Sequence, residues 1–145
     1  MALGRYHRPL PTTLQYGADG RVRIEASHQH RGIVTVRLQI TDGWHLYSHA
    51  PESADLYPTE LLSRDPQRPL SQIEYPVPLK VEPGPGQAPL AQYRGEVQIR
   101  AQLPPGTEDA LQLLELKFQA CSDSACLAPE TVMLLLPRRA PDGRR

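Results

Sequence analysis

The sequence of 145 residues lacks features that several classes of protein require. It has no run of 18 apolar residues, so it predicts no membrane-spanning helix. Its 16 basic and 16 acidic residues leave a net charge of zero, which argues against a nucleic-acid surface built on excess positive charge. The segment from Met1 to Leu14 has neither an apolar core nor a small-residue cleavage site, so we expect no signal peptide there.

Helix-forming segments are also scarce, because proline is abundant. The chain has 16 prolines, and each removes an N–H donor and clashes with the preceding helical turn. Leu, Ile, Val and Phe together make 33 of the 145 residues, just above the level below which a chain is expected to stay disordered. The length suits one domain. We therefore expect a single, loop-rich domain of β type.

Three segments alternate apolar and polar residues with the period of a strand, at residues 21–26, 33–40 and 96–103. Shorter strands are expected at 72–75 and 79–81, at sheet edges where the surrounding prolines are tolerated. Residues 107–120 fit either a helix with the stripe Leu111, Leu114 and Phe118 or a strand. We favour a strand that forms a hairpin with residues 132–136, because the segment leads directly into a turn between two cysteines.

About seven to nine antiparallel strands with frequent turns are typical of an all-β, two-sheet sandwich. We expect an irregular segment at residues 1–19, the sandwich at 20–137 and a basic tail or linker at 138–145.

The two cysteines, Cys121 and Cys126, are separated by four residues. At the mouth of a hairpin loop, this spacing allows a disulfide. It differs from the Cys-x-x-Cys arrangement of thioredoxin-type enzymes, and Asp123 within the loop disfavours a thiolate. Because no basic residue occurs between Phe118 and Met133, we expect the free thiols to have pKa values above the ordinary value of about 8.5.

Spacing alone leaves several interpretations open. A structural disulfide closing so short a ring contributes only about 2 kcal/mol in the chain-entropy model. Two free buried thiols and half of a zinc site are further alternatives. No Gly-rich phosphate loop, Ser-His-Asp order or paired-carboxylate motif is present, and we expect no cofactor. A small metal-binding module would use His28 and His30, which a strand would place on one face, with His45 and His49 elsewhere in the chain.

Three segments together resemble a known family. They are Asp42-Gly-Trp-His-Leu-Tyr-Ser48, then Ile73-Glu-Tyr-Pro76 followed by Tyr93-Arg-Gly-Glu-Val97, and Phe118-Gln-Ala-Cys-Ser-Asp-Ser-Ala-Cys-Leu-Ala-Pro-Glu-Thr131. The last is the most specific of the three. The chain resembles, over roughly residues 20–137, the N-terminal domain of the thiol:disulfide interchange protein DsbD and its relatives.

That resemblance implies an immunoglobulin-like β-sandwich in the bacterial periplasm, forming part of a protein-disulfide reductase. In the family, a thioredoxin-like domain of the same protein supplies electrons through a membrane domain. The partners that receive them are thioredoxin-fold proteins, such as disulfide isomerases and cytochrome c maturation thioredoxins. A non-catalytic interaction sandwich with a structural disulfide remains the alternative.

The resemblance also implies roles for individual residues. Cys121 and Cys126 match the redox pair, and the second cysteine forms the mixed disulfide with partners. Tyr93 falls in the segment that shields the pair in the family, although Gln92 stands where a shielding aromatic would be expected. Tyr47 is a candidate for lining the cysteine site. Independently of the family, Cys121 follows an apolar run ending at Ala120, so it should be the more buried cysteine.

Overall fold

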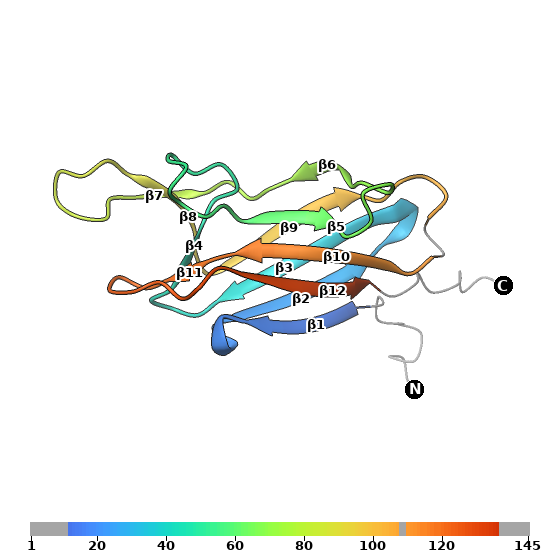
Figure 1. Cartoon of the computed structure of the whole chain (residues 1–145), viewed down its shortest axis with the longest axis horizontal. Coiled ribbons are helices and arrows are strands. Elements are labelled where there is room, and N and C mark those ends of the chain that lie inside the picture. The colour runs from blue at the N-terminus through green and yellow to red at the C-terminus, as the bar shows by residue number, and fades with distance from the viewer. Residues whose placement is uncertain (1–11, 108–109, 137–145) are drawn as a thin grey trace, which may run out of the picture.

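The computed structural model describes residues 12–107 and 110–136, and nearly every regular element in that part of the chain is a strand. Figure 1 shows two facing layers of antiparallel strands. One layer has the order β1-β2-β3-β9-β6 and the other the order β12-β10-β5. A third sheet, β11-β4-β8-β7, lies at the end where β10 leads to the cysteine loop. The immunoglobulin-like sandwich is confirmed.

Twelve strands form these sheets, more than the seven to nine predicted, because bends and prolines divide the chain into short pieces. Their bounds are β1 Thr12–Gly17, β2 Val22–His28, β3 Ile33–Ile40, β4 His45–Tyr47, β5 Glu60–Ser63, β6 Ser71–Glu74, β7 Leu79–Val81, β8 Leu90–Tyr93, β9 Glu96–Gln102, β10 Gln112–Phe118, β11 Ala120–Cys121 and β12 Glu130–Leu136. Two short 3-10 turns, Ala18–Gly20 and His30–Gly32, complete the regular structure of the described residues. No helix among the described residues has the length and apolar character needed to cross a membrane.

The predicted hairpin is confirmed and supplies much of the core. Strands β10 and β12 pair from Gln112 opposite Leu136 to Phe118 opposite Glu130. The helix alternative is therefore wrong for residues 112–118. The strand period sends Leu114, Leu116 and Phe118 inward, and all three are fully buried.

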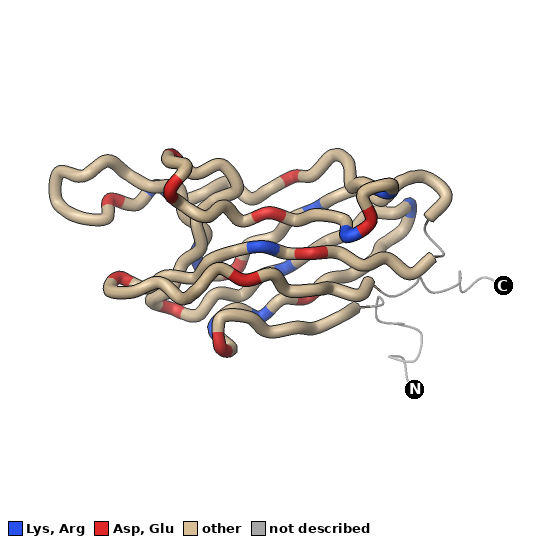
Figure 2. Tube along the Cα trace, in the orientation of Figure 1, with Lys and Arg blue, Asp and Glu red and all other residues tan. Residues whose placement is uncertain are grey.

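The opposite layer buries its apolar face in the same way. In β3, the alternate residues Val34, Val36, Leu38 and Ile40 are buried as predicted. Its outward face carries charge: Arg37 lies 3.7 Å from Glu25 and 3.3 Å from Glu96 on the two neighbouring strands. Figure 2 shows basic and acidic positions interspersed over the described strands. The outer face of this layer is therefore charged, whereas the outer face of β10 and β12 also exposes Leu113 and Leu135.

The predicted irregular segment at residues 1–19 is wrong for its described part. Residues 12–17 form β1, which pairs along its whole length with β2. Most side chains of β1 are solvent-exposed, so its apolar pattern was too weak to indicate a strand. Residues 1–11 and the predicted tail at 138–145 lie outside the described residues.

The end of β1 fits closely against the hairpin. A Cβ atom at Gly17 would lie 2.6 Å from Cζ of Phe118 and 3.3 Å from Cγ2 of Val132. The next residue, Ala18, donates its backbone N–H to Oε1 of Glu130 at 2.7 Å. The absence of a side chain at Gly17 therefore allows β1 to approach the start of β12.

We predict that Gly17→Ala lowers the free energy of unfolding by about 1–3 kcal/mol, because the buried Phe118 ring must move to admit the methyl group. Denaturant titration followed by far-UV circular dichroism measures the change. Gly84→Ala is the matched control, since only the flexible Gln87 side chain lies near that position. Equal stability of the two variants would contradict the close packing described here.

Candidate functional site

The two cysteines form a disulfide at the open end of the sandwich. Their Cα atoms are 4.0 Å apart, and their backbones form an antiparallel bridge. Cys121 is the last residue of β11, whereas Cys126 lies four residues before β12 begins at Glu130. The disulfide that the spacing allows is therefore present, although only Cys121 belongs to a strand.

Hydrogen bonds independent of the sulfur atoms hold the loop between the cysteines. Ser122 donates its N–H to the carbonyl of Ala125 at 2.7 Å, and Ala125 donates its own N–H to Oγ of Ser122 at 3.2 Å. Below the loop, Leu127 N–H bonds the carbonyl of Ala120 at 2.9 Å, and Nε2 of Gln119 donates to the carbonyl of Leu127 at 3.0 Å. The loop therefore has a defined shape that does not rest on the disulfide alone.

The two sulfur-bearing residues differ sharply in accessibility. Cys121 is only 1% exposed, whereas Cys126 is solvent-exposed. The difference arises because Cys121 continues the hairpin, directly after the buried Ala120, while Cys126 lies on the outer side of the loop. The predicted order of burial is confirmed, so an incoming thiolate can approach Cys126 more readily than Cys121.

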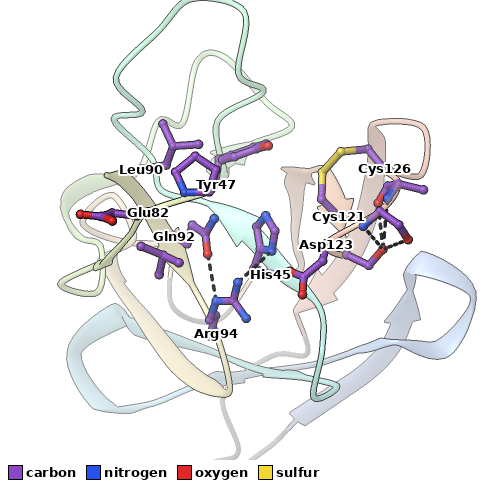
Figure 3. A pocket seen from close by; sticks show the side chains of 14 residues that line it. His45, Tyr47, Glu82, Leu90, Gln92, Arg94, Cys121, Asp123 and Cys126 are labelled. Atoms are coloured by element: carbon purple, nitrogen blue, oxygen red, sulfur yellow. Dashed lines mark hydrogen bonds between the residues drawn. A yellow bond between two sulfur atoms is a disulfide. The ribbon is translucent and has the colours of Figure 1, made fainter. Parts of the chain in front are cut away.

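An open cleft of about 720 Å³ lies beside the disulfide (Figure 3). One wall is the cysteine loop, residues 121–126, and the other comes from β4, from β8 with the following Arg94, and from the end of β7 with the segment after it. The side chains that face the disulfide across it include His45, Tyr47, Glu82, Leu90, Gln92 and Arg94.

A chain of polar contacts crosses the floor of the cleft. Nε of Arg94 donates to Oε1 of Gln92 at 2.9 Å, and Nη2 of Arg94 lies 3.4 Å from Nδ1 of His45. A guanidinium has no acceptor, so Nδ1 of His45 must accept and the proton of the neutral imidazole is on Nε2. Arg94 therefore fixes the tautomer of His45.

The position of His45 follows from strand pairing. In the antiparallel pair of β11 and β4, Cys121 is directly opposite His45, and Ala120 is opposite Leu46. Residues directly opposite in such a pair have Cβ atoms about 4.5–5.5 Å apart and project from the same face. His45 is only 5% exposed. A buried imidazole therefore lies beside the buried cysteine.

Burial is the main cause of a lowered pKa at His45, because it disfavours the charged imidazolium. The positive charge of Arg94 lowers the pKa further, and the carboxylate of Asp123 opposes both effects. His45 therefore stays neutral over a wider range of pH than an exposed histidine does.

Of the other residues predicted for the site, two lie at the cleft and one does not. Tyr47 and Asp123 both line the cleft, as the sequence suggested. Tyr93 does not: it is 1% exposed within the apolar core, and its hydroxyl accepts the backbone N–H of His49 at 3.3 Å. Alternation along β8 and the residue after it explains the difference, since Gln92 and Arg94 face the cleft when Tyr93 faces the core.

The histidines do not form the metal site considered as an alternative. His28 is the last residue of β2 and is fully buried, whereas His30 begins a 3-10 turn and is exposed, so they do not share a strand face. His49 stacks on Tyr75 with ring centroids 4.0 Å apart. Within residues 12–107 and 110–136, no group of three His, Cys, Asp or Glu side chains is placed to hold a metal ion.

Sequence reasoning missed Arg94 and the positions of Gln92 and His45 in the cleft. The only available signal was period-two alternation, which places Gln92 with Arg94, and His45 with Tyr47, on common faces. The expectation of raised thiol pKa values considered only residues near the cysteines in sequence. Arg94, the residue after β8, lines the cleft and its positive charge favours a thiolate, while the burial of Cys121 disfavours one. That expectation stays a prediction.

Comparison with known protein families places this site in context. The family model described as "Thiol:disulfide interchange protein DsbD, N-terminal" matches residues 15–137, which include both cysteines and most of the described chain. The chain belongs to this family. As a DsbD N-terminal domain, it is a thiol–disulfide exchange domain, and the disulfide beside the cleft is the group suited to that chemistry. A comparison with curated protein sequences finds no match.

Solved structures show that the fold is shared. The reduced DsbD N-terminal domain of Neisseria meningitidis has a TM-score of 0.60 at 16% identity, with 96% of each chain covered. The same domain in a complex with the PilB N-terminal domain has a TM-score of 0.61 at 16% identity, covering 87% of this chain and 90% of that one. The N-terminal periplasmic domain of ScsB from Proteus mirabilis has a TM-score of 0.61 at 20% identity, covering 93% of this chain and 56% of that one.

We predict opposite changes in the pKa of His45 when its two charged neighbours are neutralised. Arg94→Gln removes a positive charge and should raise the pKa, whereas Asp123→Asn removes a negative charge and should lower it. NMR titration of the His45 ring resonances in the oxidised DsbD-type domain measures both shifts. Arg100→Gln, an exposed residue of β9 that does not line the cleft, is the control for a general charge effect. Shifts of the same sign in Arg94→Gln and Asp123→Asn would contradict this electrostatic arrangement.

Proposed function

We propose that this chain is a periplasmic domain that passes electrons from a thioredoxin-like donor to periplasmic proteins of thioredoxin fold through Cys121 and Cys126. The observation that carries the proposal is the pairing of one exposed cysteine with one buried cysteine beside an open cleft. Exchange requires an accessible sulfur that a partner can attack and a second sulfur close enough to resolve the mixed disulfide.

The proposed chemistry has two steps when the domain accepts electrons. A donor thiolate attacks Sγ of Cys126, the Cys121–Cys126 bond breaks, and Cys121 leaves as a thiolate that then takes up a proton. The donor's second thiol displaces Cys126 from the mixed disulfide, which leaves the domain with two thiols. Electron delivery reverses the order: Cys126 attacks a partner's disulfide, and Cys121 resolves the resulting mixed disulfide.

The relatives support the proposed location and partners. The ScsB relative is described as a periplasmic domain, and a DsbD N-terminal relative forms a complex with the N-terminal domain of PilB. We assign the redox unit to residues 20–137 together with β1, because β1 pairs with β2 and its neighbour Ala18 bonds Glu130 next to the cysteine loop.

A structural disulfide is the competing function, and two observations weigh against it. The bond closes a short ring that already has its own hydrogen bonds, so its contribution to stability is small. Cys126 is also exposed, whereas a purely stabilising disulfide has no need of access. In redox buffers of defined potential, a bond that resists reduction below about −300 mV would favour the structural function.

We predict that Cys121→Ala traps a mixed disulfide with a thioredoxin-fold protein lacking its own resolving cysteine, and does so far more readily than Cys126→Ala. The physical reason is that the remaining thiol is exposed in the first variant and buried in the second. Non-reducing electrophoresis and mass spectrometry measure the yield. Preferential trapping by Cys126→Ala would reverse the two roles, and trapping by neither variant would favour the structural disulfide.

A further inference from the structure

The hairpin of β7 and β8 carries much of the cleft wall that faces the cysteine loop. Val81 ends β7, Leu90 begins β8, and both line the cleft together with Glu82 and Pro83 of the loop between them. In Figure 1, this loop extends from the end of the sandwich that carries the cysteine loop. Strand β7 is the outer strand of its sheet, so among the described strands only β8 pairs with it. The position of this wall therefore depends on how β8 is held.

The backbone of β4 and the residue after it hold only part of β8. Beyond the last pair of the β4–β8 ladder, the same register places Ser48 opposite Ala91. Ser48 donates its N–H to the carbonyl of Ala91 at 3.0 Å, as one half of such an antiparallel pair. The carbonyl of Ser48, however, accepts the N–H of Thr59 at 3.3 Å. The N–H of Ala91 must therefore find a different acceptor.

The carboxylate of Glu52 supplies that acceptor. The N–H of Ala91 lies 3.1 Å from Oε1 and 3.0 Å from Oε2 of Glu52. Lys80 of β7, directly opposite Ala91, donates from Nζ to Oε2 of Glu52 at 2.9 Å. The hydrogen bond from Lys80 and, less strongly, that from Ala91 lower the pKa of Glu52 from its ordinary value, so the carboxylate is charged at neutral pH. One side chain therefore ties both strands of the hairpin to residues 48–59, the segment after β4.

That segment is itself fixed to the body of the domain. The hydroxyl of the fully buried Thr59 donates to the carbonyl of Tyr47 at 2.6 Å. Near the start of the segment, the backbone N–H of His49 donates to the hydroxyl of the buried Tyr93 at 3.3 Å. Glu52 therefore projects from a segment that is held near both of its ends, and it can serve as a fixed support for the hairpin.

We propose that Glu52 is a positioning residue that fixes the β7–β8 wall of the cleft for the docking of a thioredoxin-fold partner. The inference rests on the proposed function and names the part of the site that a protein partner needs and a small thiol does not. A protein bonded to Cys126 covers the cleft that this cysteine lines, and so it also meets the opposite wall. Docking on a wall that is already ordered is favoured, because ordering mobile groups at an interface costs free energy.

Removing the carboxylate should release this wall. Ala91 is only 2% exposed, and a buried N–H that loses its acceptor is costly, so β8 gains by shifting to expose it. The sulfur atoms lie on the other wall, in the cysteine loop, which has hydrogen bonds of its own. The chemistry of Cys126 should therefore be the same with and without Glu52, whereas the docking of a protein should differ.

Two reagents that react with the same thiolate separate docking from chemistry. In the Cys121→Ala domain, the thiol of Cys126 loses its proton to solvent and attacks either 5,5′-dithiobis(2-nitrobenzoate) or a thioredoxin variant whose single active-site cysteine carries nitrothiobenzoate. A disulfide to Cys126 forms, the bond to nitrothiobenzoate breaks, and nitrothiobenzoate leaves with the electron pair. Its absorbance gives both rate constants. The rate constant with thioredoxin divided by that with the small reagent is the docking ratio.

Adding Glu52→Ala should lower the docking ratio at least about fivefold, through a higher half-saturating concentration of the thioredoxin reagent. The small reagent should react within about twofold of its former rate. Asp55→Ala is the matched control, because it removes another exposed carboxylate of the same segment that does not line the cleft. An unchanged docking ratio in Glu52→Ala, or an equal fall in Asp55→Ala, would overturn the inference.

Two further variants separate the hydrogen bond to Ala91 from the ion pair with Lys80. Glu52→Gln keeps an oxygen that can accept the N–H of Ala91, so it should restore most of the docking ratio. Lys80→Gln should leave the ratio within about twofold, because an exposed ion pair contributes little. Hydrogen exchange of the Ala91 amide, followed by NMR, should be at least about tenfold faster in Glu52→Ala. Unchanged protection of this amide would refute the support of β8 by Glu52.

The trapping experiment tests the proposed function separately, because it depends on the two cysteines and not on Glu52. Preferential trapping by Cys121→Ala, together with an unchanged docking ratio in Glu52→Ala, would refute only the role of Glu52. A lowered docking ratio in Glu52→Ala, together with preferential trapping by Cys126→Ala, would instead refute the roles assigned to the two cysteines.

Discussion

The site depends on one short pairing, in which β11 lies against β4. Ala120 and Leu46 are opposite one another on the core side, and both are buried. Cys121 and His45 are the next pair, on the other face. Because a shift of one residue would exchange the two faces of a strand, the packing of Ala120 and Leu46 fixes which residues meet in the cleft. The apolar core thereby sets the chemistry beside it.

The parts of the fold that could be predicted from the sequence are the strands with strong alternation. Residues 33–40 and the β10–β12 hairpin bury one face and expose the other, so the alternation of apolar residues in their sequence predicts both the strands and their buried faces. Strand β1 is mostly exposed and is held by backbone pairing with β2. Such pairing does not require particular side chains, so the sequence does not indicate the strand. The side chains of strand β8 alternate between the core and the cleft, but three successive residues, including a glutamine, are buried, so the strand shows no alternation of buried and exposed positions.

The site was predictable only where its residues are close in sequence. The cysteine pair and the order of its burial follow from the hairpin that surrounds it. The cleft, in contrast, combines β4, β8 and the cysteine loop, and their pairing depends on contacts between residues far apart in the chain. The assignment of Tyr93 to the site was wrong for the same reason. Its segment was recognised correctly, but the face that it presents depends on the register of β8 against β4.

The hydrogen bonds of the cysteine loop have a consequence for how the domain meets its partners. Since Ser122 and Gln119 hold the loop without help from the sulfur atoms, reduction of the disulfide should leave the surrounding surface nearly the same shape. Donor and acceptor must then occupy one surface, around the single exposed cysteine, and they exclude each other. We therefore expect electron transfer through this domain to follow ping-pong kinetics, with an excess of either partner slowing the reaction of the other.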